Sequence, residues 1–225
     1  MSDDAKRRAA EAALELLPES GVIGLGTGST AKLFIEGVGR LVAAGRKLVG
    51  VPTSLQSARQ AESLGIPLLD ATGPWEIEVT VDGADEVSAA LDLIKGGGAC
   101  HAREKIVAAA SKRNVIVVDE SKLSERLGQR WAVPVEVLEF GHAATAKLLG
   151  SFGTPVLRVK DGAVVRTDAN NLIYDLAAGV IEDPAGLEAA LANVPGVVES
   201  GLFVGRASTV LVAGESSVRR LDRSA

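Results

Sequence analysis

The chain has very little of several residues on which whole classes of protein depend. Cys100 is the only cysteine among 225 residues, so no disulfide can form within the chain and a reducing compartment is expected. The two histidines, His101 and His142, have no partner at the spacing of metal ligands, which disfavours a metal site. Aromatic residues make up only 3%, and alanine, valine, leucine and glycine dominate, as in closely packed α/β proteins.

Long apolar runs and an excess of positive charge are also missing. No apolar stretch approaches the length of a membrane span, and the charged, helix-like N-terminus does not have the pattern of a signal peptide. The net charge of −5 argues against nucleic acid or an anionic membrane as the main partner. We therefore expect a soluble, cytoplasmic protein that binds neither nucleic acid nor membrane.

Short apolar strands alternate with helical patterns up to about Gly128. Strands are predicted at Val22–Leu25, Lys47–Val51, Ile66–Leu69, Ile77–Val81, Leu91–Ile94 and Asn114–Asp119. Helices are predicted at 3–17, 31–43, 54–64 and 100–111. This alternation predicts an α/β fold with a mostly parallel sheet that is covered on both faces.

A different order of elements follows Gly128. Strands are predicted at 132–138, 155–160, 164–167 continuing into 171–175, and 197–203, with helices at 143–149 and 184–192 and a turn at Asp161-Gly162. This β-α-β-β-α-β order is the ferredoxin-like pattern. The buried strand 209–212 is expected to return to the first sheet. We therefore expect an α/β domain at 1–129 and 207–225, with an inserted α+β domain at 130–206 as a candidate oligomer interface.

A glycine-rich turn with the sequence Gly26-Thr27-Gly28-Ser29-Thr30 joins the first predicted strand to the next helix. Backbone N–H groups at a helix N-terminus bind anions, and glycines let a phosphate approach closely. The Walker pattern is absent, and the dinucleotide-binding pattern fails at Ser29 and lacks an acid after the next strand. The alternative is a tight turn in which Ser29 or Thr30 caps the helix. The three hydroxyl groups favour phosphate.

Two carboxylates, Asp82 and Asp85, flank Gly83 and Ala84 at the end of a predicted strand. Open α/β sheets bind ligands beyond the carboxyl ends of their strands, so the position suits a site. The alternatives are a turn with an aspartate cap and, less favoured because histidines are scarce, a metal site. Glu86 is equally consistent with a solvated helix residue, and we leave it out of the site.

Lys95 and the glycines Gly96, Gly97 and Gly98 follow the next short strand, and Glu104 lies early in the helix after them. A lysine beside a glycine loop can stabilise a developing oxyanion, and a solvated lysine is the alternative. Glu104 suits the dipole of a helix start, and near other carboxylates it can also act as a base. Lys122 follows a further strand, where it either meets a phosphate or is an exposed loop residue.

The motifs GLGTGSTAKLFI, VPTS, VDGADEV, IKGGGACHAREKIV, VVDESKL, PVEV and PGVVESGLF span nearly the whole chain. In this order they resemble ribose-5-phosphate isomerase, type A, and the combination of DGADE, KGGG and REK is highly specific. The resemblance implies interconversion of D-ribose 5-phosphate and D-ribulose 5-phosphate in the non-oxidative pentose phosphate pathway, without a cofactor or a metal. It also implies a Rossmann-like domain with an inserted ferredoxin-like domain, assembled as a homodimer or homotetramer.

The same resemblance assigns roles to residues by motif. Substrate loops are implied at Thr27–Thr30, Asp82–Asp85 and Lys95–Gly98, the proton acceptor at Glu104 and a further substrate contact at Lys122. The chain departs from the family's usual TDNGN, which is replaced by TDANN at 167–171. It also has Cys100-His101 in a segment that often holds small apolar residues.

An aldose–ketose isomerisation moves a proton from C2 to C1 through an enediolate. We expect Glu104 to move this proton, and Lys95 with the backbone N–H groups of Gly96–Gly98 to stabilise the negative charge. Asp82 and Asp85 are expected to orient the sugar hydroxyls and to assist ring opening. Contacts to the phosphate, whose binding energy positions the distant carbon, are expected from Ser29, Thr30, Lys122 and Lys6.

Three other functions compete with this hypothesis. An amino-sugar-phosphate deaminase or a lactonase needs a histidine near the acids, and His101 is the only candidate. We expect His101 and Cys100 to be packing or helix-start residues instead. A sugar-phosphate sensing domain needs the phosphate loop but neither base nor lysine, and the acidic chain has no recognisable helix-turn-helix. A dinucleotide oxidoreductase is disfavoured by Ser29 and the missing acid.

Overall fold

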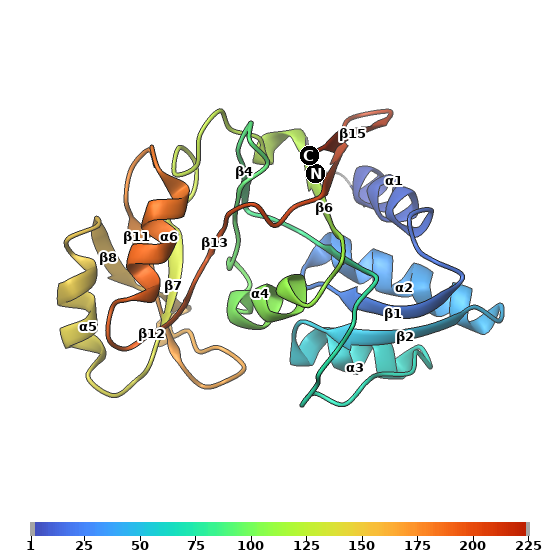
Figure 1. Ribbon diagram of the computed structural model, residues 1–225, viewed down its shortest axis with the longest axis horizontal. Helices are drawn as coiled ribbons and strands as arrows, with labels where there is room; N and C mark the ends of the chain where they lie inside the picture. Colours follow the sequence, from blue (N-terminus) through green and yellow to red (C-terminus); the bar gives the residue numbers. More distant parts are fainter. Residues whose placement is uncertain (1–2, 224–225) are drawn as a thin grey trace. The chain divides into compact units, whose positions relative to one another are not determined.

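The computed structural model describes residues 3–223, and the ends of the predicted first domain, residues 1–2 and 224–225, lie outside the described residues. The chain divides into two compact units, and Figure 1 labels most of their elements. Unit 1 consists of Met1–Gly83, Arg103–Lys122 and Arg206–Ala225, and unit 2 of Ala84–Ala102 and Leu123–Gly205. The proposed insertion at 130–206 lies in unit 2 apart from Arg206, and unit 2 also includes 84–102 and 123–129.

Unit 1 is built around a six-stranded sheet with the strand order β15-β14-β6-β3-β1-β2. Its strands are β1 (Ser20–Leu25), β2 (Lys47–Pro52), β3 (Val79–Asp82), β6 (Asn114–Asp119), β14 (Thr209–Ala213) and β15 (Val218–Asp222). Its helices are α1 (Asp3–Leu14), α2 (Ser29–Ala43), α3 (Leu55–Ser63), α4 (His101–Ala109, the first two residues counting with unit 2) and the 3₁₀ helix η1 (Glu120–Lys122). Every neighbouring pair is parallel except β14 with β15, which confirms the mostly parallel sheet.

Both faces of this sheet are covered because its central strands are apolar on both sides. The first five residues of β6 are all buried. One face packs on α1 and α2 through a core that includes Ala9 and Phe34. The opposite face packs on α4, where Val107 joins Val51 and Ile77 in a second cluster. The sheet therefore holds α4, and with it Glu104, in a fixed place in unit 1.

The strand order produces a switch point between β1 and β3. The chain passes from β1 to β2 on one side and then returns to β3 on the other side. Loops that leave the carboxyl ends of such neighbouring strands diverge, and the crevice between them is where sheets of this class bind ligands. Residues 26–28 follow β1 and Asp82 ends β3, so two of the predicted site segments lie at this point.

Unit 2 contains a four-stranded antiparallel sheet with the order β12-β7-β11-β8. Its strands are β7 (Val133–Val137), β8 (Thr154–Leu157), β11 (Leu172–Ala177) and β12 (Val197–Ser200), and its helices are α5 (His142–Leu149) and α6 (Pro184–Ala192). Numbered along the chain these strands lie in the order 4-1-3-2, which is the ferredoxin-like arrangement. Leu149 and Leu191 are buried in the core that the two helices share with the sheet. The helix at 184–192 was predicted at its observed bounds.

Two smaller sheets complete unit 2. One has the order β13-β5-β4 and is formed by β4 (Glu86–Val87), β5 (Leu93–Ile94) and β13 (Leu202–Phe203). The other is a hairpin of β9 (Val159–Lys160) and β10 (Ala163–Val164). Asp161 and Gly162 join these strands with φ angles of 53° and 79°, as a type I′ turn requires. The predicted turn is therefore in place.

The structure differs from the predicted strands at several places. The predicted strand 155–160 divides into β8 and β9, and the predicted strand 164–167 does not continue into β11, because β9 and β10 form a sheet of their own. The segment 66–69 forms only an isolated bridge between Leu68 and Gly50, and β15, which was not predicted, pairs antiparallel to β14. The predicted strand 197–203 breaks at Gly201, because its two parts join different sheets. Gly201 donates its N–H to the Pro134 carbonyl at 2.6 Å and accepts from the Lys95 N–H at 2.8 Å. A side chain at this crossing would collide with both neighbours.

The segment TDANN contains a substitution that its backbone explains. Asn170 has a φ of 64°, in the left-handed region, and it stands where the pattern TDNGN has glycine. Asparagine adopts this conformation more readily than other residues with a side chain. The turn therefore keeps its shape, with the Asn170 N–H donating to the Thr167 carbonyl at 2.8 Å.

Glu86 is not the solvated helix residue that the sequence left open. It lies in β4 with no exposed surface. Its carboxylate accepts three backbone hydrogen bonds, from the N–H groups of Gly128 at 3.0 Å, Arg130 at 3.1 Å and Trp131 at 3.2 Å. The side chain thus ties the segment after Asp85 to the start of the ferredoxin-like sheet within unit 2.

Replacement of Glu86 by alanine is expected to lower the free energy of unfolding by at least about 3 kcal/mol, because three backbone donors lose their charged acceptor. Urea unfolding of wild type and variant measures the difference. Glu182→Ala removes a carboxylate from an ion pair with Arg126, in which the Glu182 side chain is 74% exposed, and is expected to change stability by less than about 0.5 kcal/mol. Equal effects of the two substitutions would contradict the assignment.

Candidate active site

The turn after β1 presents the start of α2 at the switch point. The N-cap is Gly28, whose φ of 119° favours glycine, and no side chain caps the helix. The alternative in which Ser29 or Thr30 caps the helix is therefore wrong, and both lie in the first helical turn. Ser29 is exposed and Thr30 is buried. A helix start without a side-chain cap leaves its backbone N–H groups for an anion.

The Thr27 side chain is the centre of a hydroxyl network that the sequence did not indicate. Its Oγ1 lies 2.8 Å from Thr53 Oγ1, 2.8 Å from Ser54 Oγ and 3.2 Å from Ser57 Oγ. Ser57 in turn donates to the Gly26 carbonyl at 2.6 Å. The VPTS motif and the start of α3 thus support the loop after β1. In the sequence, the VPTS motif was the only sign of these contacts, because they join loops that follow two neighbouring strands.

Asp82 is oriented by backbone donors at the end of β3. Its Oδ1 accepts from the Thr27 N–H at 3.0 Å and from the Gly83 N–H at 2.8 Å. A Cβ on Gly26 would collide with the same carboxylate, so the loop approaches β3 as closely as only glycine allows. Asp82 is buried, with 4% of its surface exposed. Its carboxylate therefore has a fixed direction in the crevice between β1 and β3.

Lys122 lies at the carboxyl end of β6, in η1. The preceding Asp119 accepts from the Ser121 N–H at 2.8 Å and from the Ser121 hydroxyl. Burial opposes ionisation of Asp119, but the Ser121 donors and the nearby charge of Lys122 outweigh it, and the pKa of Asp119 lies below its ordinary value. An ionised Asp119 thus helps to hold Lys122 at the edge of the sheet at which β1 and β3 also end.

Glu104 lies in the first turn of α4 and is buried, with 5% of its surface exposed. Lys105 is equally buried, whereas the neighbouring Ile106 is 58% exposed. A surface helix normally has the opposite arrangement, since glutamate and lysine are rarely buried. Packing therefore does not explain the charged face of α4. A carboxylate held in a fixed, water-poor place is what general base catalysis requires.

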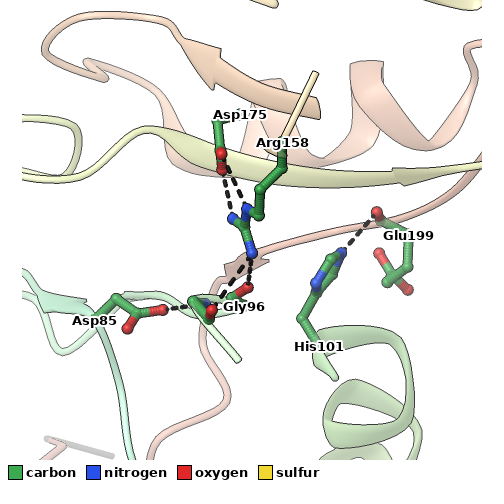
Figure 2. Close-up of polar contacts among 7 residues, drawn as sticks. Asp85, Gly96, His101, Arg158, Asp175 and Glu199 are labelled. Carbon is green, nitrogen blue, oxygen red and sulfur yellow. Dashed lines mark hydrogen bonds and ion pairs between the residues drawn. The ribbon is translucent and has the colours of Figure 1, made fainter. Parts of the chain in front are cut away.

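The second part of the candidate site belongs to unit 2, where Asp85 meets the glycine loop (Lys95–Gly98) (Figure 2). The Asp85 Oδ2 accepts from the Gly97 N–H at 2.7 Å, and the Asp85 N–H donates to the Ile94 carbonyl at 2.9 Å. A Cβ on Gly97 would lie 2.7 Å from the Asp85 carboxylate. The Gly97 N–H was expected to donate to an oxyanion. It donates to the Asp85 carboxylate instead, so this part of the expectation is corrected.

Lys95 is not a solvated lysine at a strand end. Only 4% of its surface is exposed, and its Nζ lies 5.5 Å from the centre of the Phe203 ring. The Lys95 N–H is held by the Gly201 carbonyl, which belongs to the same crossing that ends β12. A cation against an aromatic face is stabilised without being neutralised. Lys95 thus lies in a nearly buried place in which a lysine can stabilise an oxyanion.

His101 and Cys100 lie beside the glycine loop. The His101 Nε2 is 3.2 Å from the Glu199 carbonyl (Figure 2), and its buried ring lies next to Gly96. The Cys100 Sγ donates to the Gly98 carbonyl at 3.2 Å. Both side chains thus contact backbone carbonyls of unit 2, and His101 is also the first residue of α4.

The structure therefore shows two groups of predicted site residues. Unit 1 brings together the turn after β1 and Asp82, and it also contains Gly83, Glu104 and Lys122. Unit 2 brings together Asp85 and the glycine loop, and it also contains Ala84. Between residues 3 and 223, the structure shows no group of three or more histidine, cysteine, aspartate or glutamate side chains that could hold a metal. Over the same range, no helix has both the length and the apolarity to cross a membrane.

Comparison with known proteins gives one consistent family. Residues 49–217 match the family model described as ribose 5-phosphate isomerase A (phosphoriboisomerase A). The chain is 48% identical to ribose-5-phosphate isomerase A of Gloeobacter violaceus over 225 residues, which cover 99% of this chain and 98% of that protein.

Two solved structures are similar along the whole chain. The ribose 5-phosphate isomerase of Plasmodium falciparum has a TM-score of 0.95 at 34% identity, with all of both chains covered. A D-ribose-5-phosphate isomerase in complex with phospho-erythronic acid has a TM-score of 0.94 at 38% identity, with 99% of this chain and 100% of that chain covered.

The lowered pKa of Asp119 predicts a pH-dependent contribution to stability. Its ionised form stabilises the fold above about pH 4, the ordinary pKa of aspartate, and this is lost as the pH falls through the lower folded value. Asp119→Asn is expected to reduce the free energy of unfolding by up to about 1 kcal/mol at pH 7, since solvent screens a partly exposed group. Urea unfolding should give the same difference at pH 7 and pH 5 and a smaller one at about pH 3; a difference that stays constant down to about pH 3 would contradict the assignment.

Proposed function

We propose a catalytic mechanism for this chain, which belongs to the ribose 5-phosphate isomerase A family. The chain is an aldose–ketose isomerase that interconverts D-ribose 5-phosphate and D-ribulose 5-phosphate. The reaction removes the proton from C2 of the open aldose, forms an enediolate and returns a proton to C1. It needs a base, a group that stabilises the enediolate oxygen and groups that bind the phosphate. The residues of the candidate site supply each of these.

Glu104 is the base that moves the proton between C2 and C1. The single observation that carries this assignment is its burial in the first turn of α4, on a helix whose exposed face includes an isoleucine. A carboxylate in this place has lost part of its hydration, which raises its reactivity towards a carbon acid. Between the two transfers Glu104 holds the proton as a neutral carboxylic acid, and the helix start favours its charged form before the first transfer and after the second.

Lys95 and the glycine loop stabilise the enediolate oxygen. Lys95 supplies a full positive charge in a nearly buried position, where electrostatic interactions are stronger than in water. Because the Gly97 N–H is engaged by Asp85, the loop contributes the Gly98 N–H as the neighbouring donor. Preorganised groups of this kind are each worth about 10²–10³ in rate.

Asp82 and Asp85 orient the sugar hydroxyls and assist opening of the ring. Each carboxylate has one oxygen committed to backbone N–H groups, Asp82 through Oδ1 and Asp85 through Oδ2. These contacts fix the direction of each carboxylate, so that it can meet a sugar hydroxyl without reorganisation.

The phosphate is held at the start of α2. Ser29 and Thr30 offer hydroxyls and helix N–H groups, and Lys122, with Lys6 as a further candidate, offers positive charge. Contacts to this distant group use binding energy to place the reacting carbons.

Several wider properties belong to the same proposal. The enzyme acts in the cytoplasm, within the non-oxidative pentose phosphate pathway, and uses neither a cofactor nor a metal. Residues 1–129 and 207–225 form the Rossmann-like catalytic domain, and residues 130–206 form the ferredoxin-like domain. The latter is the proposed interface of a homodimer or homotetramer.

Glu104→Gln keeps the shape of the side chain and removes the base. We expect kcat for the isomerisation of ribose 5-phosphate to fall by about 10²–10⁴-fold, the usual contribution of a positioned base. Binding of phospho-erythronic acid, whose carboxylate resembles the charged enediolate, is expected to persist in calorimetric titration.

The matched control is Glu78→Gln, which changes a half-buried glutamate of unit 1 that is paired with Lys112. Its kcat should equal that of wild type. Wild-type turnover in Glu104→Gln would remove Glu104 from the mechanism.

A further inference from the structure

The peptide unit between Gly96 and Gly97 is held from both sides. Its carbonyl oxygen accepts from the Arg158 Nη1 at 2.7 Å, and its N–H donates to the Asp85 Oδ2 at 2.7 Å (Figure 2). In a trans peptide these two groups point in opposite directions. Arg158 and Asp85 therefore lie at opposite ends of one rigid plane, and the orientation of either end sets that of the other.

Arg158 is itself fixed by a bidentate ion pair. Its Nε donates to the Asp175 Oδ2 at 2.9 Å, and its Nη2 donates to the Asp175 Oδ1. The pair is largely shielded from solvent, with 14% of the Arg158 side chain and 32% of the Asp175 side chain exposed. This leaves Nη1 directed at the glycine loop, where it also lies 3.4 Å from the Gly97 carbonyl.

The strands of unit 2 explain why the pair has this geometry. Arg158 lies between β8 and β9, and its N–H donates to the Ile173 carbonyl at 2.8 Å. Asp175 lies two residues further along β11, opposite Val156. The sheet thus presents the two side chains next to each other and makes them a rigid support rather than a surface contact.

The charges along this chain of contacts alternate. The Asp175 carboxylate meets the Arg158 cation, the cation meets the negative end of the Gly96–Gly97 peptide dipole, and the positive end of that dipole meets the Asp85 carboxylate. Hydrogen bonds arranged in this way polarise one another. Arg158 thereby strengthens the Gly97 N–H as a donor to Asp85. Figure 2 shows no direct hydrogen bond between the side chains of Arg158 and Asp85.

We propose that Arg158, held by Asp175, is a positioning residue for Asp85 and the glycine loop in the isomerase reaction. The inference rests on the proposed function, in which Asp85 orients the sugar hydroxyls. The pair fixes the plane of the Gly96–Gly97 peptide, and this plane sets the direction of the Asp85 carboxylate. Arg158 does not contact the substrate in this account. It acts on the reaction through Asp85.

Arg158→Met retains the length of the side chain and removes its donors. We expect kcat with ribose 5-phosphate to fall by about 10–100-fold, the scale of a small misplacement of a catalytic group, while KM changes by less than about threefold. Arg158→Lys keeps the charge and one donor but not the fork, and it should recover part of the loss. Asp175→Asn, which retains Arg158 itself, should lower kcat in the same direction.

The matched control is another bidentate pair of unit 2. Arg166 donates to Glu139 through Nη1 at 3.0 Å and Nη2 at 2.6 Å, but its contacts are to the surface turn at Asn170. Arg166→Met should therefore leave kcat and KM unchanged. Thermal unfolding of all variants separates a loss of folded protein from a loss of turnover per folded molecule.

Combination with Asp85→Asn tests whether Arg158 acts through Asp85. If it does, the double variant Asp85→Asn/Arg158→Met should have a kcat within about threefold of Asp85→Asn alone. Multiplication of the two single losses would overturn the inference, as would an Arg158→Met kcat within twofold of wild type while Asp85→Asn is impaired. Wild-type turnover in Asp85→Asn would instead refute the proposed role of Asp85, and the inference with it.

Discussion

The hydrogen bond from the Thr27 N–H to the Asp82 carboxylate, 3.0 Å long, joins the two strand ends at which β1 and β3 part. It requires a glycine at 26, because any side chain there would occupy the place of the carboxylate. It also requires the parallel register in which Leu25 lies opposite Val81. One contact of the main sheet thus fixes both the turn that we propose binds the phosphate and the first carboxylate that we propose orients the sugar.

Unit 2 also fixes the direction of a carboxylate, but through different contacts. Asp85 is oriented by a loop peptide rather than by a strand end, and that peptide is held by Arg158. Both aspartates therefore have one oxygen committed to backbone donors, although the supports come from unrelated parts of the fold. Buried charge elsewhere in unit 2 has a structural use, as in Glu86, whose carboxylate binds three backbone N–H groups. The burial of Glu86 is thus explained by its structural contacts, whereas packing does not explain the burial of Glu104 in α4.

Local patterns in the sequence were sufficient for most of the architecture. The apolar run of β6 and the helix α6 follow from neighbouring residues, and the parallel sheet and the ferredoxin-like order follow from the succession of such elements. Failures occur where distant segments meet. The edge strand β15 is too polar to resemble a buried strand, and Gly201 breaks a strand only because the chain crosses Lys95 and Pro134 there.

The residues of the site also divide into those with a local signal in the sequence and those without one. Glycine loops and strand-end carboxylates carry a local signal, so the turn after β1, Asp82, Asp85 and Lys95 could be selected from the chain alone. The supports could not, because Arg158 acts on a loop 61 or 62 residues away in the sequence and carries no motif of its own. Ser57 likewise shows its role only when β1 and β2 lie side by side.

Proton NMR of the isomerisation in D₂O, with EDTA present, tests the enediolate account most directly. Purified protein is incubated with D-ribose 5-phosphate, and the isotope at C1 of the product is measured. The account predicts D-ribulose 5-phosphate with solvent deuterium at C1, alongside a fraction in which the original proton is returned. Product that contains only the original proton at C1, or no product at all, would contradict it.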